Sequence, residues 1–218
     1  FNELDNNFID INVMDLKFQG ELEWKPIRGL AFNVLGSYRI NRSMREHNIK
    51  NNSNQAEAYR AGVDNPNIMY SNTYLYSDPD KPNSLPISVM PTGGIYIENK
   101  NVVEQLDFRG TVNYNHIWSA GGEEAHIFNA LAGMEANRAD YDASEQQQYG
   151  VNYDQSRIVT ITPDFFKQAR EEGTDLASFA RSYNRRLAYF GNVNYSYKGR
   201  YSTNFTARYD GSNQLGKS

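Results

Sequence analysis

The end of the sequence, Gly211 to Ser218, matches the pattern G-x-x-x-x-G-K-S, in which backbone amides and a lysine bind the phosphates of a nucleotide. A working phosphate loop follows a continuous apolar strand and opens a helix, because the helix N-terminus attracts phosphate. Here polar and apolar residues alternate from Thr203 to Arg208, and no helix follows within this sequence. A P-loop nucleotide-binding protein is therefore a remote alternative.

Two groups of histidine or acidic side chains raise the question of a metal site. His116 and His126 face each other if a tight turn joins their segments, but no third ligand shares their face. Asp78, Asp80 and Asn83 lack the spacing and the bidentate glutamate of a calcium-binding EF-hand loop. We expect no metal site and no cofactor. No Ser/His/Asp group or carboxylate pair has an interpretable spacing, so we do not expect an enzyme.

The segment from Leu187 to Tyr209 has the clearest structural pattern in the chain. Apolar or aromatic residues occupy nearly every second position on both sides of Lys198-Gly199-Arg200. This period of two is typical of β-strands whose two faces meet different surroundings. A turn centred on Gly199 predicts three cross-strand pairs: Tyr197 with Tyr201, Val193 with Phe205, and Tyr189 with Tyr209.

Two other segments follow the same plan. The first pairs residues 16–24 with 30–38 across a turn in which Pro26 cannot extend the ladder. The second pairs 106–118 with 128–136 across a turn at 120–123, and its return strand is less regular because Ile127 and Leu131 fall on the other face. The predicted strands are approximately 13–25, 29–40, 103–118, 124–138, 186–197 and 201–210.

Aromatic residues at both ends of each apolar face favour a membrane barrel over a soluble sandwich. Tyr189 and Tyr197 lie about 26 Å apart along a strand, and a tilt of about 40° reduces this to about 20 Å, near the ~25 Å apolar band of outer-membrane barrels. We predict an all-β fold that is part of a large antiparallel transmembrane β-barrel, with about six strands in three hairpins. About six strands cannot enclose a wide lumen, so residues 1–218 are expected to form a single internal segment of a barrel domain.

The composition argues against several classes of partner and of structure. The 218 residues are 39% hydrophobic and carry a net charge of -4, which argues against a nucleic-acid partner. The mean hydropathy is -0.74, and no apolar run is long enough for a transmembrane helix. The 16 tyrosines suit the aromatic belts of a membrane interface. The absence of cysteine excludes a disulfide scaffold and thiolate metal sites.

Long connections separate the three short-turned hairpins, at about 41–101 and 140–184, and are predicted to be extracellular loops with short helices. In the second loop, Thr162 as cap, Pro163 and the terminating Gly173 indicate one helix, and Thr174 is a candidate start for another. Loops of this length are usually functional. The loop tyrosines are candidate substrate contacts, although they could equally pack the loops together: Tyr70, Tyr74, Tyr76, Tyr149 and Tyr153.

The polar face of the second hairpin carries Asp107 and Arg109, which would face a wet lumen. These charges could guide a substrate. Charges inside barrels more often pair with one another or with a plug domain, and the sequence does not choose between these roles. Both residues are therefore candidate substrate contacts as well.

The C-terminal stretch contains Tyr189-Phe-Gly-Asn-Val-Asn-Tyr-Ser-Tyr197 and then Ala207-Arg-Tyr-Asp-Gly-Ser-Asn-Gln-Leu-Gly216. It resembles SusC/RagA-type TonB-dependent outer-membrane transporters, in which a Tyr-Phe-Gly-Arg strand precedes Arg-x-Asp-Gly-Ser-Ser-x-Phe-Gly. Asn192, Asn213 and Leu215 depart from that pattern. The specific resemblance covers about thirty residues, and the rest of the chain agrees in style only.

The resemblance implies uptake of oligosaccharides, other glycans or peptides across the outer membrane of Bacteroidota. It also implies a barrel of about 22 strands with a plugged lumen. The implied partners are a SusD-like surface lipoprotein, the TonB complex, the substrate and outer-membrane lipid. The plug and the TonB box are not in this sequence. The main alternative from the residues alone is a secreted all-β carbohydrate-binding module.

Overall fold

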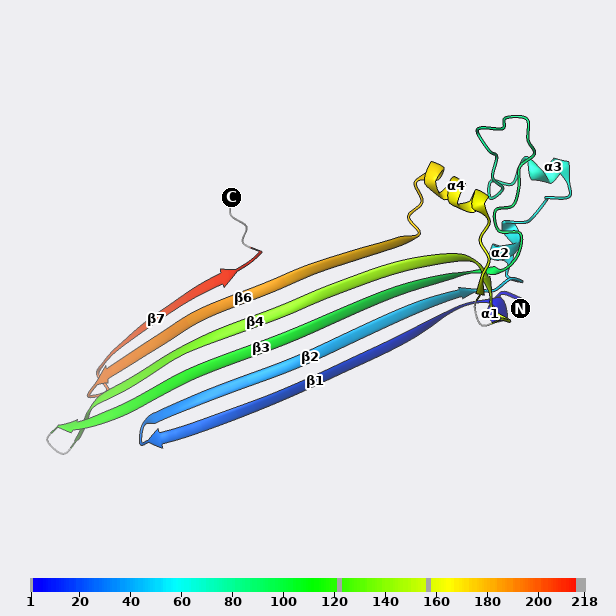
Figure 1. The fold of residues 1–218 in the computed structure, drawn as a ribbon. Helices are drawn as coiled ribbons and strands as arrows, with labels where there is room; N and C mark the ends of the chain where they lie inside the picture. Colours follow the sequence, from blue (N-terminus) through cyan, green and yellow to red (C-terminus); the bar gives the residue numbers. More distant parts are fainter. Residues whose placement is uncertain (1, 121–122, 156–157, 215–218) are drawn as a thin grey trace. The chain divides into compact units, whose positions relative to one another are not determined.

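The structure is a computed structural model that describes residues 2–120, 123–155 and 158–214. The fold is all-β: one antiparallel sheet has the strand order β1-β2-β3-β4-β6-β7, and β5 pairs with β4 (Figure 1). Consecutive long strands are therefore neighbours, as in an up-and-down meander. The strands are β1 (Asn7–Ile27), β2 (Leu30–Ile49), β3 (Gly94–Ala120), β4 (Glu123–Asn152), β5 (Ile158–Val159), β6 (Ala177–Tyr197) and β7 (Tyr201–Ser212).

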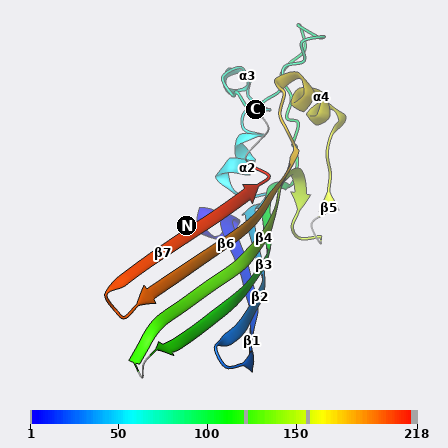
Figure 2. The same ribbon diagram turned by 90° about the vertical axis from the view of Figure 1, so that its left-hand side faces the viewer.

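Short helices precede the first strand and interrupt the two long connections (Figure 2). They are α1 (Asn2–Asn6), α2 (Asn54–Ala58), α3 (Pro66–Met69) and α4 (Pro163–Glu172). Among the described helices, none has the length and apolarity needed to cross a membrane.

The chain divides into two compact units, each of which is described by itself. The loop unit comprises the chain up to Val13, Ser43–Asn101 and Ala143–Ala180. It contains the helices, β5, and the segments of β1, β2, β3, β4 and β6 that fall within these ranges. The strand unit comprises Met14–Arg42, Val102–Asp142 and the chain from Arg181 onward.

The strands extend well beyond the ranges expected from the sequence. β2 continues to Ile49, β3 begins at Gly94, β4 continues to Asn152 and β6 begins at Ala177. The connections are therefore about 50–93 and 153–176, shorter than the predicted loops 41–101 and 140–184. The added strand segments contain few alternating apolar residues, and backbone pairing needs no such pattern, so hydrophobic periodicity could not reveal them.

The β6–β7 hairpin has the predicted register. Tyr197 pairs with Tyr201, Val193 with Phe205 and Tyr189 with Tyr209. Lys198 and Gly199 have positive φ angles of 48° and 64°, and the Arg200 amide donates to the Tyr197 carbonyl at 3.0 Å, which closes the turn. The predicted turn of the second hairpin, at 120–123, includes residues 121–122, which lie outside the described residues.

The strand unit has an apolar face and a polar face. The apolar face consists of the even-numbered residues of β1–β4 and the odd-numbered residues of β6 and β7, as strand alternation requires. Its large side chains are exposed, among them Phe18, Trp24, Leu106, Val193 and Phe205. Nothing in the described chain covers this face.

The loop unit has its own buried core. Ile49, Ala56, Met90 and Ile95 form one cluster, and Tyr76, Val89 and Phe165 form another. The predicted helix is confirmed as α4: the Thr162 hydroxyl accepts from the Phe165 amide, and Gly173 ends the helix with a φ of 66°. The second predicted helix, from Thr174, is wrong, because the Gln147 amide donates to the Leu176 carbonyl at 2.8 Å and β6 begins at Ala177.

Candidate functional sites

The polar face of the strand unit holds a network of paired charges that includes both predicted lumen residues. Asp107 accepts hydrogen bonds from Ser37 at 3.0 Å and from Asn137, and so joins β2, β3 and β4. Arg109 forms an ion pair with Glu135 at 3.4 Å, and Arg208 binds the same carboxylate at 3.0 Å. Asp107 and Arg109 therefore bind their neighbours within the sheet.

An aromatic ring lies within this network. The guanidiniums of Arg109 and Arg208 lie over the Phe190 ring, at 5.5 and 5.6 Å from its centroid. Gly133 makes room for the ring, since a Cβ there would meet the Phe190 side chain at 2.4 Å. The glycine within a strand pattern was the available signal for such a close approach.

A polar cavity of about 450 Å³ adjoins the network on the same face. Its lining includes Asn137, Asn184, Arg186 and Arg208. Asn184 is 9% exposed, and its side-chain carbonyl has no hydrogen-bond partner. The cavity thus presents guanidinium donors beside an unused acceptor, a combination that suits a polar ligand or a polar segment of protein.

The five predicted loop tyrosines differ in their exposure. Tyr76 is 5% exposed, and its hydroxyl donates to Glu171 at 2.7 Å. Burial and this hydrogen bond raise the pKa of Tyr76 to about 12. Tyr149 packs on Phe165 with 4.7 Å between ring centroids, and Tyr153 donates to the Ile95 carbonyl at 2.8 Å. These three tyrosines take part in packing the loop unit.

Tyr70 and Tyr74 are the most exposed tyrosines of this set. Tyr70 is 70% exposed and Tyr74 is 48% exposed. Tyr59, which sequence reasoning did not select, packs on Tyr74 with 5.0 Å between centroids and on Tyr149 with 5.9 Å. Burial among these rings raises the pKa of Tyr59 above its usual range. The exposed rings of Tyr70 and Tyr74 are available to a ligand. The ring of Tyr74 is also held on one side by its contact with Tyr59.

A second cavity, of about 330 Å³, lies within the loop unit, and Tyr153 contributes to its lining. Its other lining residues include Asn6, Lys50, Asn51, Asn152 and Asp154. The side-chain oxygen Oδ1 of Asn51 accepts from the Gly93 amide at 3.0 Å and from Arg60 at 2.8 Å. Gly93 has a φ of 85°, and a Cβ there would meet the Gly150 backbone at 2.5 Å, so this junction requires glycine.

The aspartates considered for calcium bind a lysine. The Lys167 ammonium of α4 contacts Asp78 and lies 2.7 Å from Asp80. The hydrogen bond from Lys167 holds the pKa of Asp78 below its usual range, and the aspartates raise the pKa of Lys167. No group of three or more potential ligands (His, Cys, Asp or Glu) occurs among the described residues.

The two histidines and the phosphate-loop match singled out from the sequence lie on the long strands, as far as the structure describes them. The ring of His126 lies 2.7 Å from the Tyr195 hydroxyl, whereas His116 packs against Trp118 with 4.6 Å between centroids. Gly211 and Ser212, the start of the phosphate-loop match, are residues of β7. Residues 215–218, which complete the match, lie outside the described part of the chain.

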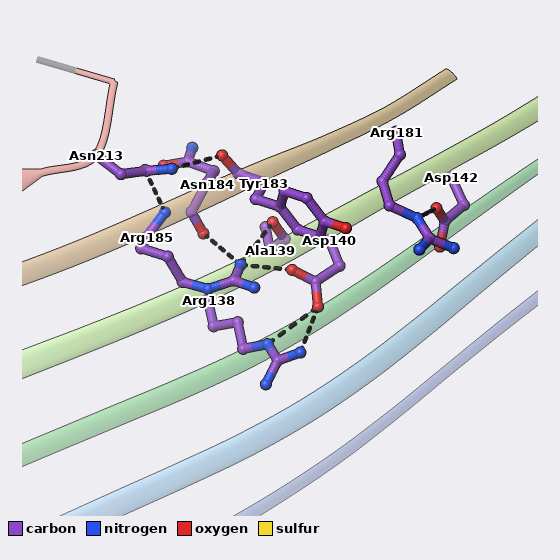
Figure 3. Close-up of polar contacts among 9 residues, drawn as sticks. All are labelled: Arg138, Ala139, Asp140, Asp142, Arg181, Tyr183, Asn184, Arg185 and Asn213. Carbon is purple, nitrogen blue, oxygen red and sulfur yellow. Dashed lines mark hydrogen bonds and ion pairs between the residues drawn. The ribbon is translucent and has the colours of Figure 1, made fainter. Parts of the chain in front are cut away.

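A second group of charged residues lies on β4 and β6 of the strand unit (Figure 3). By strand alternation Arg138, Asp140 and Arg185 lie on the same face as the apolar residues. Asp140 on β4 accepts from Arg138 at 2.6 Å and forms an ion pair with Arg185 of β6 at 2.5 Å. Arg181 binds Asp142 one step further along the same strands. Two guanidiniums thus share the carboxylate of Asp140, and Glu104, which lines a cavity with Arg138 and Asp140, balances the second positive charge.

The side chain of Asn213 fixes one edge of this group of charged residues (Figure 3). Its carbonyl accepts from the Arg185 amide at 2.7 Å, and its amide donates to the Tyr183 carbonyl at 2.8 Å. The asparagine thereby continues the β6–β7 ladder after β7 ends at Ser212. Sequence reasoning noted Asn213 only as a departure from a motif and did not foresee this contact.

Comparison with known proteins places the fold. No protein-family model matches the sequence, and no curated protein gives a significant match. The structure of the RagAB peptide transporter matches with a TM-score of 0.60 and 16% identity, over 97% of this chain and 19% of that chain. The chain shares its fold with part of a peptide transporter.

Two further structures give the same result. The RagAB peptide importer in its "closed-closed" state matches with a TM-score of 0.60 and 16% identity, and in its "open-open" state with 0.58 and 14%. In both cases the match covers 97% of this chain and 19% of the other chain. The chain therefore spans about a fifth of the length of the solved chains that it matches, and at this identity the likeness concerns the fold.

Proposed function

We propose that this chain is a stretch of barrel wall from an outer-membrane, TonB-dependent nutrient transporter of the SusC/RagA type. The observation that carries the proposal is the uncovered apolar face of the strand unit, with aromatic residues such as Trp24 and Tyr189 at its ends. A soluble protein rarely exposes so large an apolar surface, whereas a barrel wall turns that surface toward lipid. The fold shared with part of the RagAB transporter supports the same conclusion.

In this proposal the polar face lines the lumen of the barrel. The Arg109–Glu135–Arg208 network stiffens the wall there, and the cavity beside Asn184 accepts a polar segment of a plug domain. The loop unit lies outside the cell, where the exposed Tyr70 and Tyr74 contact the substrate, an oligosaccharide or a peptide. The similar structure is that of a peptide transporter, which favours peptides as the first substrates to test.

The proposal assigns the remaining steps of transport to parts of a longer protein and to partners. A SusD-like lipoprotein covers the extracellular side, and the TonB complex supplies energy through segments that this sequence does not contain. The chain itself has no catalytic role in this scheme. Its contribution is structural in the wall and binding in the loops.

The proposal is tested on the intact protein in its host. We expect it in the outer-membrane fraction, and we expect uptake of a fluorescent oligosaccharide or peptide that stops when the proton-motive force is collapsed. Tyr70→Ala combined with Tyr74→Ala is expected to weaken uptake, while Tyr183→Ala, an exposed tyrosine of the strand unit, serves as the control. Recovery as a soluble, cooperatively folded protein without detergent would instead favour a secreted carbohydrate-binding module.

A further inference from the structure

The polar cavity of the loop unit lies where the ends of several long strands meet. β2 ends at Ile49, β3 begins at Gly94 and β4 ends at Asn152 (Figure 1). The lining residues lie at or next to these ends, together with Asn6 at the end of α1. A volume of about 330 Å³ is near the ~300 Å³ lower limit of small-molecule pockets, so the cavity would hold one small unit of a larger ligand.

Backbone contacts fix the walls of this cavity. A Cβ at Gly150 would overlap the Thr160 carbonyl, and the Thr160 amide donates to the Gly150 carbonyl at 3.0 Å. On the other side, the Lys50 amide donates to the Asn6 carbonyl at 2.7 Å. The cavity therefore has its shape before a ligand arrives, and this lowers the entropy cost of binding.

Three asparagines of the lining are each held by one atom of the side-chain amide. The Oδ1 of Asn152 accepts from the Asp154 amide at 3.0 Å, and the Oδ1 of Asn52 accepts from the preceding side chain at 2.9 Å. The Nδ2 of Asn6 donates to the backbone of α1 at 3.0 Å. The hydrogen bonds among the described residues thus leave two Nδ2 donors and one Oδ1 acceptor for a ligand, already fixed in position.

The charged residues of the described lining are Lys50 and Asp154. The Lys50 ammonium lies over the ring of Phe8, 5.2 Å from its centroid, and Phe8 is not among the described lining residues. The side chain of Asp154 is exposed. Its carboxylate can accept hydrogen bonds from hydroxyl groups, and it disfavours a negatively charged ligand.

The remaining lining residues argue for a sugar rather than a peptide. They are threonine, asparagine, glycine and tyrosine, and the described lining includes no alanine, valine, leucine, isoleucine or methionine. Recognition of a peptide uses pockets for its side chains, many of which are apolar. A neutral sugar presents hydroxyl groups, and each of them can donate and accept, as the mixture of amide, hydroxyl and carboxylate groups here requires.

We propose that this cavity binds one neutral sugar unit of an oligosaccharide substrate. The amides of Asn6, Asn52 and Asn152 bind hydroxyl groups of the sugar, and Asp154 accepts from another. The inference rests on the proposed function, because it takes the loop unit as the part of the protein that receives substrate. For this cavity it narrows the substrate to a neutral oligosaccharide, although the similar solved structures are peptide transporters.

The test measures binding of the intact protein, purified in a detergent without a sugar head group. The probes are immobilised neutral gluco-, manno-, galacto- and fructo-oligosaccharides, sulfated and carboxylated oligosaccharides, and short peptides. We expect the wild-type protein to bind at least one neutral oligosaccharide. Binding of no neutral oligosaccharide, with or without binding of acidic oligosaccharides or peptides, overturns the proposal.

A single substitution tests the free amide donor of Asn152. Asn152→Asp keeps an oxygen for the Asp154 amide but removes the Nδ2 donor, so binding of the neutral oligosaccharide should weaken about tenfold. Asn65→Asp is the matched control, because its Oδ1 likewise accepts a backbone amide, that of Asn67 at 3.1 Å, outside this cavity. Equal binding by the two variants overturns the proposal.

A second measurement applies if Asn152→Asp does not fold. Hydrogen exchange of the wild-type protein is compared with and without the neutral oligosaccharide that it binds. Slower exchange is expected for the amides of 50–52 and 92–93, and protection confined to other segments overturns the proposal.

The outcomes separate this site from the proposed function. A protein that resides in the outer membrane and imports peptides, yet binds no neutral oligosaccharide, disproves the sugar site alone. A protein that is soluble without detergent, yet binds a neutral oligosaccharide through Asn152, supports the sugar site and disproves the barrel wall.

Discussion

The loop unit and the strand unit differ in the burial of their large apolar side chains. In the loop unit, Phe165 is 6% exposed within a packed cluster, whereas in the strand unit Phe205 is 70% exposed. Among the described residues of the strand unit, the buried apolar side chains are two alanines, Ala139 and Ala188. The loop unit can therefore draw stability from its own hydrophobic core, whereas the described residues of the strand unit form no comparable core.

The largest loss of stability is expected from a substitution in the core of the loop unit. Phe165→Ala is expected to lower the free energy of unfolding of the loop unit by about 3–5 kcal/mol, because it leaves a cavity between Tyr76 and Val89. Phe166→Ala, at a 55% exposed position of the same helix, should cost less than about 1 kcal/mol. Hydrogen exchange of the loop-unit amides in the intact protein measures both, and similar losses would show that this core is not what stabilises the unit.

A slightly smaller effect is expected on the apolar face of the strand unit. Val193→Lys should destabilise the barrel by about 2–4 kcal/mol if the residue lies near the bilayer midplane. Asn194→Lys, on the opposite face of the same strand, should be tolerated. Denaturant unfolding of the intact protein in lipid vesicles measures the difference, and equal tolerance at the two positions would contradict the assignment of the faces.

The next prediction concerns the helix cap of α4, whose loss should affect the start of that helix and not the core of the loop unit. Thr162→Ala removes the acceptor for the Phe165 amide and the donor to the Val89 carbonyl, so we expect a loss of about 1 kcal/mol. Thr174→Ala, just beyond the same helix, is the control. Exchange rates of the first α4 amides should rise only in the Thr162 variant, and a matching rise in the control would argue against the cap.

The smallest expected effect is the pH dependence of the contact between Lys167 and Asp78. The pKa of Asp78 is lowered by Lys167, so its contribution is present above the ordinary value of 3.8 and is lost as the pH falls through the lower folded value. The pKa of Lys167 is raised, so its contribution is present below 10.5 and is lost only at higher pH. Proteolysis of the loops should speed up below about pH 4, and Lys167→Ala should abolish that change.

The sequence predicted the parts of the fold in which alternation is strong. The register of the β6–β7 hairpin followed from Gly199 and the flanking tyrosines, and α4 followed from its cap and its terminating glycine. The outer strand segments escaped prediction because stretches such as 143–148 have polar residues on both faces, so their pairing depends on backbone hydrogen bonds alone.

Prediction of the sites was limited because they are built from long-range contacts, which a single sequence does not show. The sequence left Tyr76, Tyr149 and Tyr153 as candidates either for ligand contact or for packing, and each has a partner inside the loop unit. Asp107 and Arg109 were placed correctly on the polar face. Their partners, such as Asn137 and Glu135, come from a neighbouring strand whose register the pattern did not fix.

The bonds that α4 makes to the first long connection also have a mechanical consequence. Thr162 holds Val89, Lys167 holds Asp78, and Glu171 holds Tyr76, although these partners are far apart in the sequence. These bonds join the described residues of the two long connections, so we expect the two connections to move together and not as independent loops. A ligand or partner that displaces one connection would then displace the other as well.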